Sequence, residues 1–316
     1  MCCRDHWFIP PLHSSITFVL QMAKTWATKV QVRNNQLMLY DYPIEGYSQP
    51  AWRKPPTRKG YSGEVTKETV RRIKQAVDVF LQLSEQRKVT NPTNGKMMPF
   101  KASFITLTVS ALKPIRCDEG HDALKSFLQH FKRPWHKRKM SEQVKSYLWK
   151  AELQKRGQLH YHITTNSFLH WVEIRRVWND LQNSRGWLED YKARYNNKDP
   201  NSTDVHAAYK KKDMGRYLSK YLAKGEFIDC SHMGFPQLRV PVLLGGKVWG
   251  CSNDLKGKQR FNGVLDEDTW ERICIAQGND DLKVKHMERC RFLDMQHPEN
   301  LLSDDLYQGY EDWKTE

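Results

Sequence analysis

The chain has 316 residues, of which 39% are hydrophobic and 11% aromatic, so it can bury a sizeable core and does not belong to the disordered class. Its 51 lysine and arginine residues outnumber 36 acidic residues and give a formal net charge of +15. Such a surplus indicates a polyanionic partner, most often a nucleic acid, although a ribosomal-type protein or one that binds a membrane surface shares this balance.

No apolar run approaches the length of a membrane helix, and the seven cysteines are scattered without a CxxC pair. We therefore expect a soluble, unexported protein with reduced thiols, located in the cytoplasm and without a membrane partner.

Residues 1–62 are expected to form an irregular N-terminal extension that ends in a basic linker. Aromatic residues are scattered through it, and prolines and cations gather towards its end: Pro50, Arg53, Lys54, Pro55, Pro56, Arg58 and Lys59. Such a segment is either an arm that lies on phosphates or a solvated tether.

The first regular elements are a helix, a strand and a second helix. Apolar residues recur at helical spacing over residues 66–83, with Thr66 as a plausible N-cap. Strict alternation over residues 104–110 predicts a half-buried strand. Residues 121–131 are predicted to be helical, and the basic tract that follows contains Trp135, which suits a loop that contacts DNA.

Two antiparallel strands are predicted over residues 145–153 and 159–165, with a turn at Gly157. His160 and His162 point to the same side of a sheet because side chains alternate along a strand. The turn brings Glu152 back beside them, and two histidines with one carboxylate can hold a metal ion that keeps positions open for a substrate. The alternative is a pair of strand histidines with no ligand role, since this spacing is common by chance.

Further along the chain, a helix is predicted over residues 172–183 and a short strand over residues 203–208. The next helix begins near Asp213 and contains the pattern Tyr-x-x-Lys-Tyr-x-x-Lys over residues 217–224, which places two tyrosines and two lysines on one face. That face suits a hydroxyl nucleophile beside a phosphate, whereas the alternative is an ordinary amphipathic helix packed on the core.

Residues 231–316 are expected to form a C-terminal extension with short strands near residues 238–244 and 248–251 and a helix near residues 266–275. The extension ends in an acidic tail: Asp304, Asp305, Glu311, Asp312 and Glu316. The chain thus divides into residues 1–62, 63–230 and 231–316, and the element order predicts an α+β fold with a central antiparallel sheet and packed helices.

The predicted strand, the H-Y-H triplet with Glu152 upstream, and the Tyr/Lys helix occur in the order seen in the HUH (His-hydrophobe-His) endonucleases. Within that superfamily the chain resembles a rolling-circle replication initiator (Rep) of small single-stranded DNA phages or plasmids. The resemblance covers about residues 103–224, and it implies a split ferredoxin-like sheet with the H-Y-H strand in the middle and the tyrosine helix beside it.

A further segment, residues 248–252, is similar to one that follows the tyrosine helix in phage-type members. Tyr161 departs from the family pattern, which has an aliphatic residue between the histidines. The departure is mild because the side chain of Tyr161 faces the side of the strand opposite to the two imidazoles.

The resemblance implies a metal-dependent endonuclease that nicks and rejoins single-stranded origin DNA. Glu152, His160 and His162 are expected to hold one Mg²⁺ or Mn²⁺ ion. Host helicase and DNA polymerase are the expected partners besides DNA, and the cytoplasm of a bacterial host is the expected location.

The same resemblance implies that Tyr217 or Tyr221 attacks phosphorus and leaves a 5′-phosphotyrosine link. Lys220 and Lys224 are expected to favour the phenolate and to bind the phosphate. Two tyrosines one helical turn apart permit a second transfer that closes the circle, although family members with one nucleophile exist, so the roles of the two stay open.

Two other interpretations of the chain remain. One is a plasmid relaxase or a single-strand transposase of the same superfamily, against which the paired tyrosines and the lack of an appended helicase argue. The other is a basic, non-catalytic nucleic-acid-binding protein whose histidine pair is incidental. A structural zinc protein is disfavoured because the sequence offers no fourth ligand.

Overall fold

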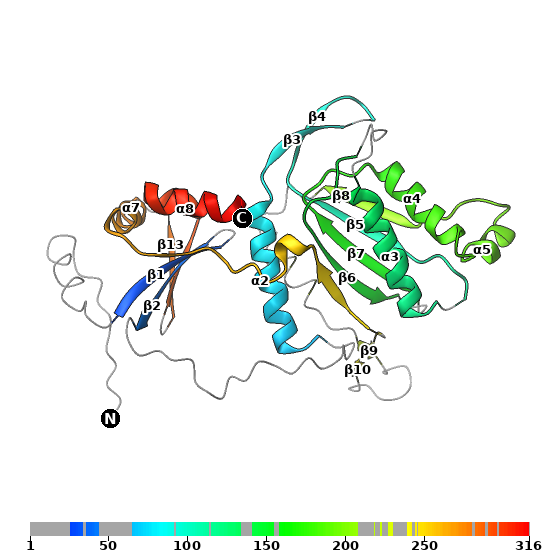
Figure 1. Ribbon diagram of the computed structural model, residues 1–316, viewed down its shortest axis with the longest axis horizontal. Helices are drawn as coiled ribbons and strands as arrows, with labels where there is room; N and C mark the ends of the chain where they lie inside the picture. The colour runs from blue at the N-terminus through cyan, green and yellow to red at the C-terminus, as the bar shows by residue number, and fades with distance from the viewer. Residues whose placement is uncertain are drawn as a thin grey trace. The chain divides into compact units, whose positions relative to one another are not determined.

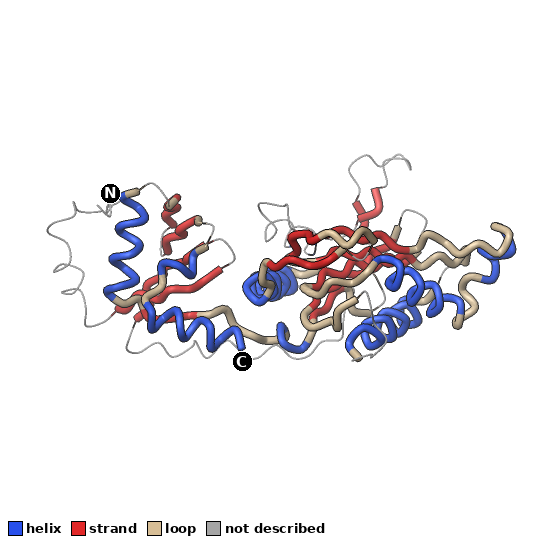
Figure 2. Tube along the Cα trace, turned by 90° about the horizontal axis from the view of Figure 1, so that it is seen from above, coloured by secondary structure: helices blue, strands red, loops and turns tan. Residues whose placement is uncertain are grey.

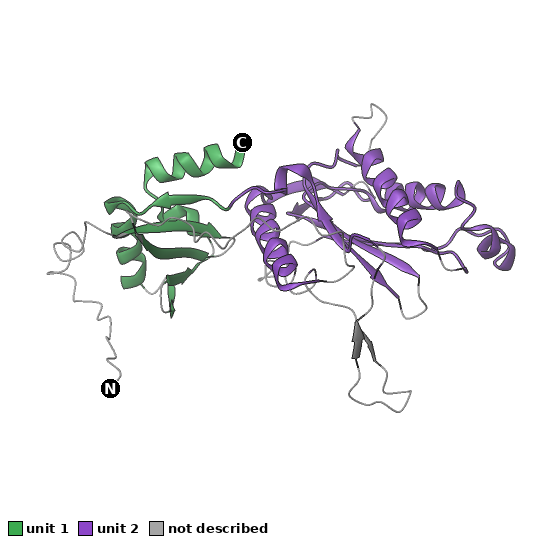
Figure 3. Cartoon of the chain, turned by 60° about the horizontal axis from the view of Figure 1, so that its bottom comes forward, with its two compact units in different colours: residues 1–56, 260–316 green, residues 57–259 purple. Residues whose placement is uncertain are grey.

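The computed structural model describes the following residues: 26–33, 36–43, 65–91, 93–113, 115–133, 141–154, 158–207, 218, 222, 227–229, 239–241, 244, 246–279, 282–287, 290–295 and 297–315. The chain divides into two compact units, one made of Met1–Pro56 with Arg260–Glu316 and the other of Thr57–Gln259 (Figure 3). We call them unit 1 and unit 2. No helix in the described part of the chain has the length and apolar character needed to cross a membrane.

Unit 2 is built on a five-stranded sheet with the strand order β11-β6-β7-β5-β8. The strands are β5 (Ser103–Thr108), β6 (Tyr147–Leu153), β7 (Leu159–Thr165), β8 (Thr203–Ala207) and β11 (Trp249–Cys251). All four pairings are antiparallel. The strand that carries the two histidines, β7, is the middle strand, which confirms its predicted position.

Helices α3 (Cys117–Lys132) and α4 (Trp171–Asn183) cover one face of this sheet (Figure 1). Seen from above, the strands form one layer and these helices another (Figure 2). The core between them takes alternate strand residues, among them Leu107, Tyr161 and Ile163, together with Phe127 and Trp178 from the helices. Antiparallel strands with one covered face therefore give the α+β class that the sequence predicts.

The other described elements of unit 2 surround this sheet. They are α2 (Lys67–Leu83), β3 (Arg87–Thr90), β4 (Met97–Phe100), α5 (Glu189–Arg194), β9 (Phe227–Asp229), β10 (Arg239–Pro241) and the 3₁₀ turn η2 (Asn253–Leu255). Helix α2 contacts β6. Its predicted N-cap is confirmed, since the Thr66 hydroxyl accepts a hydrogen bond from the Thr69 amide at 3.2 Å.

Unit 1 has its own five-stranded antiparallel sheet with the order β12-β1-β2-β14-β13. The strands are β1 (Trp26–Arg33), β2 (Gln36–Pro43), β12 (Asn262–Val264), β13 (Lys283–Met287) and β14 (Cys290–Asp294). Helices α7 (Glu267–Gly278) and α8 (Asp304–Thr315) and the 3₁₀ turn η3 (Pro298–Leu301) complete it. Its core lies on one face of the sheet and contains Val30, Val32, Leu37, Leu39 and Leu293, packed with Ile273 and Tyr310 from the helices.

Two expectations for the ends of the chain are wrong. Residues 26–43 are not irregular, because they form β1 and β2, which pair over their full length. The acidic tail is helical: α8 begins with Asp304 and Asp305, where carboxylates favour a helix N-terminus, and Tyr310 is buried in the core. Both segments gain their stability from partners distant in the sequence, since β1 pairs with β12 and β2 with β14.

Candidate active site

The face of the unit 2 sheet that α3 and α4 leave uncovered carries both histidines of β7. Tyr161 between them is fully buried in the core on the other face. In the register of the sheet, His160 lies between Glu152 of β6 and Thr108 of β5. His162 lies between Lys150 of β6 and Thr106 of β5. We call these two rows, Glu152-His160-Thr108 and Lys150-His162-Thr106, the histidine face.

Each imidazole is held by the threonine opposite it. The hydroxyl of Thr108 lies 2.8 Å from Nε2 of His160, and the hydroxyl of Thr106 lies 3.2 Å from Nδ1 of His162. The two ring centroids are 5.7 Å apart and the ring planes are inclined at 77°. The predicted strand therefore brings the two rings to one side of the sheet, as its alternation requires. The threonines, which the sequence associates with the DNA site, orient these rings.

The carboxylate of Glu152 lies against two of these side chains. Nζ of Lys150 donates a hydrogen bond to Oε1 at 2.7 Å, and Oε2 lies 3.3 Å from Nε2 of His162. Burial acts to raise the pKa of Glu152, but the hydrogen bonds from His162 and Lys150 outweigh it and lower the pKa to about 2. Glu152 is thus a carboxylate, the form that binds metal ions.

Burial also lowers the pKa of His160 to about 4, and a positive charge on His162 would act in the same direction, while Glu152 opposes both. His160 is therefore neutral near pH 7. A neutral imidazole offers a lone pair to a metal ion, whereas an imidazolium does not.

The donor set of Glu152, His160 and His162 suits a divalent metal ion, because a carboxylate and two imidazoles lie on one face of two paired strands. Within the described ranges, however, no group of three or more His, Cys, Asp or Glu side chains is arranged to hold a metal ion. Glu152 is engaged by Lys150 and His162 instead. The structure thus places the three predicted ligands side by side without converging them on one point.

Three further polar residues share this face and were not predicted from the sequence as site residues: Lys150, Asp204 and His206. Lys150 is 2% exposed, which is rare for lysine. Asp204 of β8 pairs with Thr106 in the sheet register, and its carboxylate lies 2.8 Å from Nε2 of His206. Strand alternation around Lys150 was the available signal, since Glu152 and Lys150 are two residues apart and must share a face.

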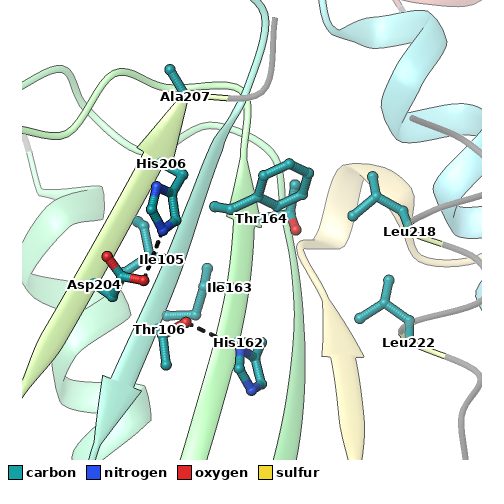
Figure 4. A pocket seen from close by; sticks show the side chains of 11 residues that line it. Ile105, Thr106, His162, Ile163, Thr164, Asp204, His206, Ala207, Leu218 and Leu222 are labelled. Carbon is teal, nitrogen blue, oxygen red and sulfur yellow. Dashed lines mark hydrogen bonds and ion pairs between the residues drawn. The ribbon is translucent and has the colours of Figure 1, made fainter. Parts of the chain in front are cut away.

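A cavity of about 570 Å³ opens on this face. Thr106, His162 and Asp204 line it from the sheet, and Leu218 and Leu222 line it from the other side (Figure 4). Both leucines are helical and almost fully buried, at 1% and 2% exposed. The helix predicted around residues 217–224 therefore contributes two apolar side chains to the wall of the cavity.

The predicted nucleophiles and their lysines, Tyr217, Tyr221, Lys220 and Lys224, lie outside the described residues, as does Asp213, the expected start of their helix. The same holds for Trp135 and most of the basic tract around it.

The buried side of β7 is anchored from behind by Tyr161. Its hydroxyl lies 2.9 Å from Nδ1 of His121 on α3, and Nε2 of His121 lies 2.7 Å from the carbonyl of Lys247. Since a carbonyl only accepts, Nε2 carries the proton and Nδ1 accepts from the Tyr161 hydroxyl. A Cβ at Gly120 would come within 2.6 Å of that hydroxyl, so the close approach of α3 requires glycine there.

The arrangement is that of an α+β domain with a histidine pair and an acidic partner on the open face of its sheet. A family model for replication-associated proteins of the ORF2 type matches residues 102–226, which span β5 to β8 and the Tyr/Lys segment but less than half of the chain. This match supports a Rep-like replication initiator, and therefore DNA as a partner. Neither the curated proteins nor the solved structures contain a match to this chain.

Proposed function

We propose that this protein is an HUH-type initiator of rolling-circle replication, a metal-dependent endonuclease that nicks single-stranded origin DNA through a tyrosine and later rejoins the ends. The observation that carries the proposal is the histidine face. Its two imidazoles sit on the central strand directly beside a carboxylate, inside the region that matches replication-associated proteins.

Glu152, His160 and His162 would hold the ion, Mg²⁺ or Mn²⁺. When bound, such an ion supplies Lewis-acid polarisation of the scissile phosphate. The hydroxyls of Thr106 and Thr108 keep the two imidazoles oriented, and the ammonium group of Lys150 balances the charge of Glu152. These contacts limit the rearrangement that metal binding requires.

The proposed nucleophile is the phenol oxygen of Tyr217 or Tyr221. A bond forms between this oxygen and phosphorus, the bond from phosphorus to the 3′-oxygen breaks, and the 3′-oxygen leaves as a hydroxyl after it gains a proton. Lys220 and Lys224 favour the phenolate, whose ordinary pKa of about 10 is too high for ionisation at neutral pH.

Leu218 and Leu222 support this role for the helix. Each is adjacent in sequence to one of the two tyrosines, and both line the same cavity as His162. A 5′-phosphotyrosine link leaves a free 3′-hydroxyl that a host polymerase extends while a host helicase unwinds the template. The second tyrosine then cuts the regenerated origin and the released end closes the circle. These steps take place in the cytoplasm of a bacterial host.

The test is incubation of the purified protein with labelled single-stranded DNA tiled across its native replicon, with Mn²⁺ or with EDTA, followed by a denaturing gel. We expect a metal-dependent protein–DNA adduct that the double variant Tyr217→Phe/Tyr221→Phe does not form. His162→Ala should also abolish the adduct, whereas His206→Ala, on the same face but outside the proposed ligand set, should retain it. Binding without any adduct would favour a non-catalytic DNA-binding protein.

A further inference from the structure

The sheet of unit 1 has a face that no described helix covers. Helices α7 and α8 and the core with Val30, Val32 and Leu293 occupy the other face. Because side chains alternate along strands, the uncovered face takes the residues between those core positions. We call this surface the platform, and its central members are Lys29, Arg33, Met38, Tyr40, Lys285 and Phe292.

The sheet register brings the members of the platform together although they are distant in sequence. Lys29 of β1 pairs with Tyr40 of β2, and Met38 of β2 pairs with Phe292 of β14. Phe292 in turn pairs with Lys285 of β13. Aromatic and basic side chains therefore alternate across four adjacent strands.

The platform is open to solvent at its rims and half-buried at its centre. Tyr40 and Phe292 are of intermediate burial, whereas Lys285 is exposed. At the two rims, Met287 is 58% exposed and Val264 is 54% exposed. In a monomeric protein, aromatic and apolar side chains gathered on one accessible sheet face indicate a binding surface.

Cations lie over the aromatic rings of this surface. Nζ of Lys29 is 4.3 Å from the ring centroid of Tyr42, and the guanidinium carbon of Arg33 is 5.4 Å from that of Phe292. Flat rings on which bases stack, with long cationic side chains that reach phosphates, are the two components of single-strand binding surfaces.

The charge of unit 1 differs between its two sides. Helix α7 begins with Glu267 and Asp268, and α8 begins with Asp304 and Asp305. The cations of these helices are paired with acids: Arg272 with Asp304, and Lys314 with Glu311. A polyanion is therefore repelled by the helical side and attracted to the platform.

We propose that the platform is a second nucleic-acid site, which binds single-stranded DNA by stacking bases on Tyr40 and Phe292 while Lys29, Arg33 and Lys285 contact phosphates. The choice of DNA over RNA rests on the proposed function of unit 2. The site itself does not, because it lies in a different unit and requires neither a metal ion nor a nucleophile.

The test uses the full chain as the Tyr217→Phe/Tyr221→Phe variant in EDTA, so that nicking plays no part. Fluorescence anisotropy with a labelled oligothymidylate of about 20 nucleotides measures its affinity. Tyr40→Ala and Phe292→Ala should each weaken binding about tenfold, whereas Tyr40→Phe, which retains the ring, should bind as the parent does. Tyr307→Ala is the matched control, since Tyr307 is 41% exposed on the acidic α8 and should not contribute.

Replacing Lys285 by Gln should lower the slope of the logarithm of affinity against the logarithm of salt concentration by about one unit. Equal affinity of parent, Tyr40→Ala and Phe292→Ala would overturn the proposal. Tighter, Tyr40-dependent binding of the matching RNA would overturn the choice of DNA. A dimer in light scattering that Tyr40→Ala dissociates, with DNA affinity unchanged, would assign the platform to a second copy instead.

Photocrosslinking of the unaltered protein to an oligonucleotide containing 5-iododeoxyuridine provides a readout that does not depend on how a variant folds. Crosslinked peptides should contain Tyr40 or Phe292 in addition to residues of unit 2. Crosslinks confined to residues 57–259 would contradict the platform while leaving the proposed endonuclease unaffected. Loss of nicking in the wild-type chain would contradict the endonuclease and leave the platform standing.

Discussion

Lys150 places a positive charge inside the histidine face at a position where lysine is rarely buried. Its contact with Glu152 is short, and Glu152 itself is only 21% exposed. Removing the ammonium group therefore leaves a partly buried carboxylate with one partner fewer, which costs more than the pair contributes as a whole.

We expect Lys150→Met to lower the free energy of unfolding by about 2 kcal/mol. The double variant Lys150→Met/Glu152→Gln should recover much of this loss, because it removes both charges. Urea unfolding of the four proteins measures the coupling as a double-mutant cycle. Additive losses from the two single changes would show that the pair is not coupled.

His121 links stability to pH. Burial lowers its pKa below the ordinary value of 6.5, although the hydrogen bond to the carbonyl of Lys247 opposes this. The unfolded chain therefore binds the proton more readily than the folded chain. The contribution of His121 to stability is present above about pH 6.5 and is lost as the pH falls through its folded pKa.

We expect His121→Gln to reduce the loss of unfolding free energy between about pH 7 and about pH 5, measured by urea unfolding at each pH. His160 and His170, whose pKa values burial also lowers, titrate in both proteins, so the difference between the two profiles isolates His121. Parallel profiles would contradict the assigned protonation of this residue.

The residues of the histidine face could be predicted in part. Spacing alone put His160 and His162 on one side of a strand and Glu152 opposite them, because both follow from period two and one turn. Lys150 was not predicted, since a lysine between apolar residues in a sequence gives no sign that the fold buries it. Asp204 and His206 reach the same face only through the pairing of β8 with β5.

At the scale of elements, the edge strand β11 depends on Gly250. Gly250 pairs with Trp149 of β6, and a Cβ on it would lie 2.5 Å from Nε1 of the Trp149 side chain. Trp149 belongs to the core and has little room to move. The close approach of these two strands therefore requires glycine at this position.

Gly250→Ala should lower the free energy of unfolding of unit 2 by about 1–3 kcal/mol, as overpacking does in other cores. Gly278→Ala is the control, because no atom lies within 4 Å of its added Cβ. Differential scanning calorimetry compares the two variants with the parent. Equal melting of the Gly250 and Gly278 variants would contradict the close packing of β11 on β6.

Long periodic elements were predicted well, and short ones were not. The helix over residues 66–83 and the strand over residues 159–165 agree with α2 and β7 to within a residue. Helix α3 begins earlier than predicted, at Cys117, because its first turn lacks apolar spacing. The short helix α5 buries none of its residues and so has no apolar stripe that could reveal it.

At the scale of the whole molecule, the two ends of the chain build one unit. Its core combines residues of β1 and β2 with residues beyond position 260, and Val30 and Leu37 are fully buried there. No local pattern predicts such a combination, because pairings between segments more than 200 residues apart are decided by packing and not by sequence periodicity.

Deleting residues 260–316 should therefore expose the apolar side of β1 and β2. We expect a fragment of residues 1–259 to bind a dye that reports exposed apolar surface and to aggregate, because its hairpin has lost its core. A fragment of residues 57–259, which lacks the hairpin as well, should remain monomeric and melt cooperatively. A monomeric 1–259 fragment without dye binding would contradict the shared core.

The measurement that tests the central claim most directly is identification of the residue that becomes linked to DNA. The protein would be incubated with single-stranded DNA from its native replicon and Mn²⁺, the adduct digested with nuclease and protease, and the peptides analysed by mass spectrometry. We predict a nucleotide joined through a 5′-phosphate to Tyr217 or Tyr221. An adduct on a residue outside this pair, or none despite DNA binding, would contradict the account.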